Sequence, residues 1–210
     1  MDTLKTSKEY EAELNRIFDR FNHHFWKDEL PEVIITFTGT RQALSHMTGW
    51  HAWKSDDGSG KYELNVSAYS IDRSPEEICE TILHEQCHLY NNIHGITDCT
   101  NKGRYHNKHF KRVAEDHGLN VTRDPSYGWS ITKLDDKAKG YVRKLKVKKF
   151  EYHREKPASK GSSLIKFLCS GCGKNSVYAT RTVSIICGYC GSMLLPVAKK
   201  APKGLSPGSF

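Results

Sequence analysis

Four of the seven cysteines stand in two matching C-x-x-C pairs, each followed by glycine. Cys169 pairs with Cys172 and Cys187 with Cys190, and 14 residues separate the two pairs. Four thiolates at this spacing satisfy a closed tetrahedral zinc site, and the residues between them are β-rich. We therefore expect a zinc ribbon held by one structural Zn²⁺. A redox dithiol pair is the alternative, but nothing thioredoxin-like surrounds either motif.

The rest of the 210-residue chain is long enough for one domain in addition to the ribbon. Hydrophobic residues make up 37% and the mean hydropathy is −0.64. No apolar run approaches the roughly 20 residues of a membrane helix, and the polar N-terminus lacks the apolar segment of a secretory signal. These features predict a cytoplasmic protein without a membrane partner, which we assume to be a monomer.

The charge is distributed unevenly along the chain. Residues 1–136 contain 16 Lys/Arg and 22 Asp/Glu, whereas residues 137–210 contain 16 and 2. An acidic body with a basic tail predicts a polyanionic partner, nucleic acid first and an anionic membrane surface second. A solvated linker with solubilising lysines is the alternative. The candidate nucleic-acid contacts are the basic side chains Arg143, Lys144, Lys146, Lys148, Lys149, Lys166 and Arg181.

The body has the pattern of an α+β domain. Apolar periodicity, β-branched runs and capping residues define its elements. In chain order we expect a helix over residues 8–26 capped by Ser7, a strand over 32–38, a hairpin of 50–54 with 62–66, a helix from Ser74, a helix from Tyr105 to Asp116, and a basic helix within 133–150. The three strands are expected to form a small antiparallel sheet.

The helix that begins at Ser74 contains the pentapeptide His84-Glu85-Gln86-Cys87-His88, which has the pattern H-E-x-x-H. At 3.6 residues per turn, His84 and His88 lie on one helix face and can bind a single Zn²⁺. Glu85 lies next to that face and can serve as general base for a zinc-activated water. Cys87 is expected to pack in the core.

A catalytic zinc ion needs a third protein ligand and one open position. His94 completes the metzincin spacing, with Asn91 in place of glycine, but Met193 is the only methionine after it and lies in the cysteine tail. His106 is the second candidate, from the start of the helix expected over 105–116. His109 is a weaker third.

The order of these elements, the His-Glu-Gln-Cys-His motif and the later His-x-x-x-Phe pattern resemble the SprT-like metalloproteases, which include the Spartan proteases. The resemblance covers residues 5–120. In that family the third ligand stands four residues before an aromatic residue, which matches His106 and Phe110, with Asn107 replacing glycine. The resemblance implies a minimal zincin-like fold in which His84, His88 and His106 hold a catalytic Zn²⁺.

The resemblance further implies a zinc endopeptidase that acts on DNA-bound or DNA-crosslinked proteins, with the basic tail holding it at DNA or the nucleoid. The alternative is a non-enzymatic nucleic-acid-binding zinc protein in which the ribbon is the functional part; Glu85 favours the enzyme, because a structural zinc site does not need it. A peptidase with a merely solubilising tail is a third possibility. The expected domains are a protease domain over 1–132, a basic helix and linker over 133–163, the ribbon over 164–197 and a flexible tail over 198–210.

Overall fold

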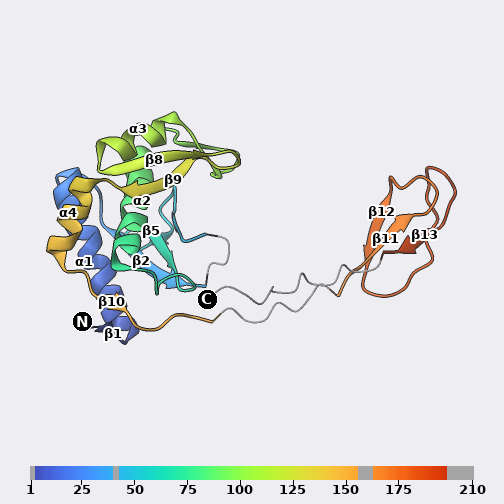
Figure 1. The fold of residues 1–210 in the computed structure, drawn as a ribbon, viewed down its shortest axis with the longest axis horizontal. Coiled ribbons are helices and arrows are strands. Elements are labelled where there is room, and N and C mark those ends of the chain that lie inside the picture. Colours follow the sequence, from blue (N-terminus) through green and yellow to red (C-terminus); the bar gives the residue numbers. More distant parts are fainter. Residues whose placement is uncertain (1–2, 40–42, 156–162, 198–210) are drawn as a thin grey trace, which may run out of the picture. The chain divides into compact units, whose positions relative to one another are not determined.

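A computed structural model describes residues 3–39, 43–155 and 163–197. The chain forms two units, a body of residues 1–156 and a C-terminal unit of residues 157–210 (Figure 1). The body combines helices with small sheets, and the C-terminal unit contains strands alone among its described residues. This arrangement confirms the expected α+β class.

Two long capped helices form the frame of the body. Helix α1 (Ser7–Trp26) begins one residue earlier than expected, because Thr6 rather than Ser7 is its N-cap and forms a capping box with Glu9. Helix α2 (Pro75–Ile93) begins as predicted, with Ser74 and Glu77 forming the same reciprocal cap. Figure 1 shows α2 in the centre of the body, with α1 to one side of it.

The first sheet has the order β2-β5-β3, with β4 also paired to β5. Its strands are β2 (Val33–Thr38), β3 (Ser45–Met47), β4 (Trp53–Lys54) and β5 (Gly60–Ser67). Strands β3 and β4 both run antiparallel to β5 and occupy one of its edges. Strand β2 takes the other edge and runs parallel to β5. The prediction of an all-antiparallel sheet was therefore wrong, because the long connection through β3 and β4 acts as a crossover.

A second sheet lies beyond α2, in the order β6-β7-β9-β8. Its strands are β6 (Cys99–Thr100), β7 (Tyr105–His106), β8 (Leu119–Asp124) and β9 (Gly128–Leu134). These four strands were not expected from the sequence. Helix α3 (Lys108–Asp116) starts later than expected, because the Asn107 side chain accepts from the backbone N–H groups of His109 and Phe110 and so caps the helix. His106 therefore lies on a strand and not on a helix.

The predicted basic helix is shorter than expected and belongs to the body. Helix α4 (Asp136–Leu145) follows directly after β9, is capped by Asp135 and ends at Lys146 in the left-handed conformation. Strand β10 (Lys149–Phe150) then pairs in parallel with β1 (Thr3–Leu4). Val142 and Phe150 are buried in the main core. Residues 133–150 are therefore not a separate linker.

The C-terminal unit is a three-stranded sheet around a small core. Strand β11 (Ile165–Cys169) pairs antiparallel with β12 (Ser176–Ala179) and with β13 (Leu194–Pro196). Phe167 and Leu194 are buried together with Cys169 and Cys187. Of residues 183–186, expected to be β-rich, only Ile186 forms an isolated bridge, with Met193. Residues 156–162 of the expected linker and all of the expected tail 198–210 lie outside the described residues.

Candidate metal centre

Three imidazoles converge between α2 and the second sheet. His84 and His88 come from one face of α2, and His106 comes from β7. Nε2 of His88 lies 3.2 Å from Nε2 of His84 and 3.1 Å from Nε2 of His106. Ligands at the usual Zn–N distance of about 2.0–2.1 Å in a tetrahedron are about 3.3 Å apart. The three nitrogen atoms therefore fit a single zinc ion.

The other ring nitrogen of each histidine faces an oxygen acceptor. Nδ1 of His84 lies 3.1 Å from Oγ1 of Thr132, and Nδ1 of His106 lies 3.3 Å from the Tyr127 carbonyl oxygen. Nδ1 of His88 lies 2.6 Å from Oδ2 of Asp98. A proton on each Nδ1 satisfies these oxygens and leaves all three Nε2 lone pairs directed at the same point, as metal ligation requires.

Burial and charge set the protonation of these groups. Burial lowers the pKa of His84 well below its usual value, and burial together with the neighbouring His88 lowers the pKa of His106 to about 4. Burial also acts to lower the pKa of His88, but the hydrogen bond with Asp98 and the charge of Glu85 raise it overall. His84 and His106 are therefore neutral at pH 7, the form that binds a metal.

The Phe110 ring packs against all three imidazoles. Its side chain is fully buried, and its ring centroid lies 4.6–4.7 Å from the centroids of all three imidazoles. The ring reaches this position because Asn107 starts α3 immediately after His106. A single aromatic side chain thus limits the orientation of every candidate ligand.

Glu85 lies beside the imidazoles in a cavity of about 970 Å³. Its side chain is 4% exposed, and its Oε1 accepts a hydrogen bond of 2.5 Å from Oγ of Ser45 on β3. Burial raises the pKa of Glu85, while the hydrogen bonds from Ser45 and from the Met47 backbone act in the opposite direction. A buried carboxyl group with a raised pKa next to a metal site is suited to accept and return a proton.

The remaining histidine candidates lie elsewhere. His94 follows the last residue of α2, and its Nε2 lies 2.9 Å from Oε1 of Glu29. His109 is exposed on α3 and is not among the residues whose ligand atoms converge. Within the described residues, the histidine cluster contains His84, His88 and His106. Cys87 is fully buried and its thiol donates to the Leu83 carbonyl oxygen, in agreement with a packing role.

The sequence pattern of the SprT-like family matches residues 14–126, which is more than half of the chain. The chain belongs to the SprT-like family. No curated protein and no solved structure matches it. Family membership indicates a zincin-like metalloprotease, and the matched region contains α2 with its H-E-x-x-H motif and His106.

Several residues that complete the centre of this SprT-like protein were not identified from its sequence. Asp98 orients His88 and is itself held by Nδ2 of Asn91 at 3.2 Å. Gly128 has a φ of +72°, and a Cβ atom there would overlap the carbonyl oxygen of His106. Of these residues, only Asp98 could have been suspected from the sequence, because it is an acidic residue in the loop that leads to His106, ten positions after His88.

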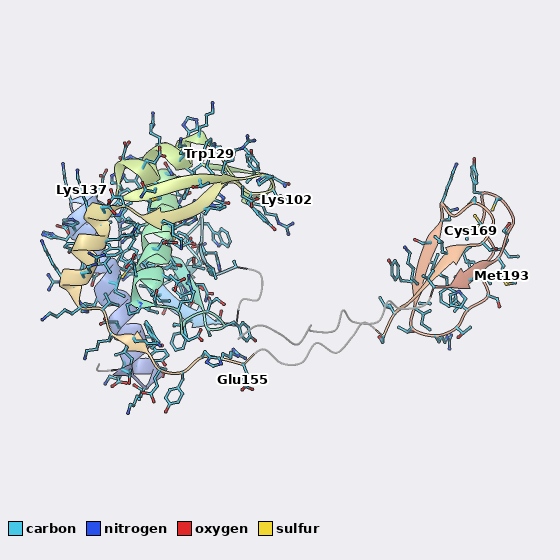
Figure 2. The ribbon with its side chains drawn as sticks, viewed as in Figure 1. Lys102, Trp129, Lys137, Glu155, Cys169 and Met193 are labelled. Atoms are coloured by element: carbon cyan, nitrogen blue, oxygen red, sulfur yellow. The ribbon has the colours of Figure 1, made fainter. Side chains whose placement is uncertain are left out.

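The C-terminal unit of the SprT-like protein brings its four cysteines together. Sγ of Cys169 lies 3.3 Å from Sγ of Cys190, and Sγ of Cys172 lies 3.8 Å from Sγ of Cys187. Ligands at the usual Zn–S distance of about 2.3 Å in a tetrahedron are about 3.8 Å apart. Hydrogen bonds from Ser192 lower the pKa of Cys190 to about 6, which favours the thiolate that zinc binds. This cluster is compatible with the expected zinc ribbon; Figure 2 labels Cys169 within it.

The basic residues of the SprT-like protein are divided between its two units. Five are exposed on the body, in and directly after α4, namely Arg143, Lys144, Lys146, Lys148 and Lys149. In the ribbon, Lys166 is half-buried with its Nζ 6.0 Å from the Tyr178 ring centroid, and Arg181 is exposed. Across the described ranges, no helix is sufficiently long and apolar to span a membrane.

Proposed function

We propose that this chain is a zinc-dependent endopeptidase that cleaves proteins bound or crosslinked to DNA. The observation that carries the proposal is the convergence of three imidazole Nε2 atoms beside the buried carboxyl group of Glu85, in one cavity open to solvent. A structural zinc site needs neither the carboxyl group nor the cavity. Two zinc ions per chain are expected, one catalytic and one structural.

In the mechanism, the cavity receives a peptide bond close to Glu85. When bound, zinc supplies the Lewis acidity that activates water and polarises the peptide carbonyl. Glu85 takes a proton from the attacking water on its carboxylate and gives this proton to the leaving amine as the C–N bond breaks. Ser45 and Met47 hold the carboxylate in place, and Asp98 and Thr132 hold the ligand rings.

Charge supports the DNA part of the proposal. The five basic residues in and directly after α4 are exposed, and the ribbon adds Arg181 and Lys166, whose Nζ lies 6.0 Å from the Tyr178 ring centroid; residues 161–210 contain six Lys/Arg and no Asp/Glu. Contacts of this kind bind phosphates and stack on bases without reading sequence, so binding should weaken steeply with salt. Association with DNA or the nucleoid follows from such contacts.

The central test compares the zinc-loaded protein with Glu85→Gln and with Glu115→Gln, an exposed control on α3. Glu85→Gln should retain two zinc ions and the fold and lose hydrolysis of a DNA-binding protein, whereas the control should remain active. Hydrolysis by Glu85→Gln at the parent rate would refute the peptidase assignment.

The same assay with and without DNA tests recruitment. DNA should accelerate cleavage of a DNA-bound substrate, and the acceleration should decline with salt. Equal rates in both conditions would remove the DNA part of the proposal and leave the peptidase. A zinc content of one per chain that is lost on replacing the four cysteines would instead favour a non-enzymatic nucleic-acid-binding protein.

A further inference from the structure

The hairpin of β6 and β7 is attached to the metal centre at both ends. Asp98, which precedes β6, faces His88, and the last residue of β7 is the candidate ligand His106. Asn107 then links the two stems, since its backbone N–H donates to the Asp98 carbonyl oxygen and its side chain donates to the Thr97 carbonyl oxygen. The base of the hairpin is therefore held next to the candidate zinc ligands.

The tip presents two cations to the cavity. Asn101, Lys102 and Gly103 have φ values of 50°, 57° and 81°, a left-handed run that turns the chain sharply. Lys102 and Arg104 both line the cavity that contains Glu85, and both are exposed. Neither makes an ion pair with another residue in the described ranges. Figure 2 shows Lys102 at the edge of the body.

The exposed charge of this cavity is positive. The two acidic residues that line the cavity already have partners: the Glu85 carboxyl group accepts a hydrogen bond from Ser45, and Asp98 is paired with His88. This local charge differs from that of the chain before β6: Lys102 and Arg104 are the two Lys/Arg that line the cavity, whereas residues 1–98 contain nine Lys/Arg and 17 Asp/Glu. The cations at the tip are thus available for a ligand.

We propose that Lys102 and Arg104, the cationic rim, select polypeptide segments that carry Asp or Glu within a few residues of the cleaved bond. This inference rests on the proposed peptidase function and names its substrate preference. We favour a peptide over nucleic acid as the ligand, because Lys102 and Arg104 line the same cavity as Glu85. The substrate of hydrolysis must lie in this cavity. Two cations on one short tip also fall short of the extended basic track that follows a nucleic-acid backbone.

The expected preference is modest. Each exposed ion pair contributes less than a tenfold change in affinity, so two cations give a preference of about 3- to 10-fold for an acidic peptide over its neutral counterpart. The preference should shrink as ionic strength rises, because both side chains are in contact with solvent.

Binding to the full-chain Glu85→Gln protein tests the rim without hydrolysis. Two fluorescent peptides of equal length are compared, one with two central Glu residues and one with Gln at those positions. The Glu peptide should bind about 3- to 10-fold more tightly, and the additional double substitution Lys102→Glu with Arg104→Glu should abolish or invert the difference. The matched control is Lys108→Glu with Arg112→Glu, two exposed cations of α3 outside the cavity; every protein in the comparison carries the same basic tail.

Cleavage sites provide the second readout. In an unfolded protein digested by the zinc-loaded chain, sites should cluster near Asp and Glu, and reversal of the rim should move them towards Lys and Arg. Equal binding of the two peptides, or an equal loss of preference in the α3 control, would overturn the inference. An oligonucleotide that displaces the Glu peptide only when the rim is intact would assign the rim to nucleic acid and also overturn it. Acid-selective binding without any hydrolysis would contradict the proposed function and leave the rim's preference standing.

Discussion

Replacement of Asp98 by asparagine should weaken zinc binding at the histidine site about tenfold. Oδ2 of Asp98 lies 2.6 Å from Nδ1 of His88, and the two side chains are only 15% and 19% exposed, so solvent screens the pair weakly. Burial acts to raise the pKa of Asp98, but its hydrogen bonds with His88 and Asn91 lower it, so the group is a carboxylate at pH 7. The substitution preserves shape and an acceptor oxygen and removes the charge.

The magnitude follows from the strength of the bond that is changed. A hydrogen bond to a charged group contributes about 1.5–3 kcal/mol, and a neutral one about 0.5–1.5 kcal/mol. The difference of about 1–1.5 kcal/mol corresponds to roughly a 5- to 12-fold change in Kd. This range overlaps the lower end of the general cost of losing an acidic partner of a metal-bound histidine, which is about 10- to 100-fold.

Competition with a chromophoric chelator measures the zinc Kd. Substitution with Co²⁺ assigns the affected site, because cobalt bound to four thiolates absorbs differently from cobalt bound to imidazoles. The control is Glu29→Gln, which makes the same chemical change in the carboxylate–histidine pair of Glu29 and His94, away from the metal centre. An affinity of Asp98→Asn within twofold of the parent, or an equal loss in the control, would refute the reasoning.

Three further outcomes are expected. The melting temperature of the metal-free protein should rise from pH 4 to 6.5, because burial, with the charge of His88, lowers the pKa of His106 from 6.5 to about 4 and the unfolded chain binds more protons in that window; an unchanged slope in His106→Gln would contradict this. Ser45→Ala should lower kcat at unchanged zinc content, because Glu85 loses its hydrogen-bond donor, and Ser45→Thr should restore kcat. Equal turnover by the parent and both variants would show that Ser45 does not position Glu85. Gly128→Ala should weaken zinc binding at the histidine site by displacing the His106 backbone, whereas Gly140→Ala, which meets open space within α4, should have no such effect in the same titration.

The elements predicted correctly are those specified by short-range pattern. Helix α2 starts at Ser74 because its capping box involves residues three positions apart, and Thr6 with Glu9 forms the same motif at α1. Ser7 was expected as the N-cap in place of Thr6, because Ser and Thr are both favoured at this position and the two residues are adjacent. Strands β6 and β7 were not predicted, because each has only two residues and the place of β7 in the sheet depends on the distant pairing of His106 with Gly128. Strands β8 and β9 have six and seven residues and pair with each other as a hairpin, so a local pattern for them was present and was missed.

By itself, the sequence determined the family, the position of His84 and His88 on one helix face, and the two cysteine pairs at zinc-binding spacing. Each of these depends on the geometry of a few consecutive residues, which the backbone sets locally. Spacing alone left His94 and His106 both open as the third ligand. The tertiary structure distinguishes them, because β7 must pair with β9 next to Gly128 before His106 reaches the other two rings.

The roles of Asp98, Thr132, Ser45 and the cationic rim also required the tertiary structure. Each side chain acts on a residue at least ten positions away, or on a cavity formed by several elements. Such contacts arise from the packing of helices and sheets, and no local pattern in the chain encodes them. The sequence therefore determined which side chains can ligate a metal, and the fold decided how those side chains are oriented and which charges surround them.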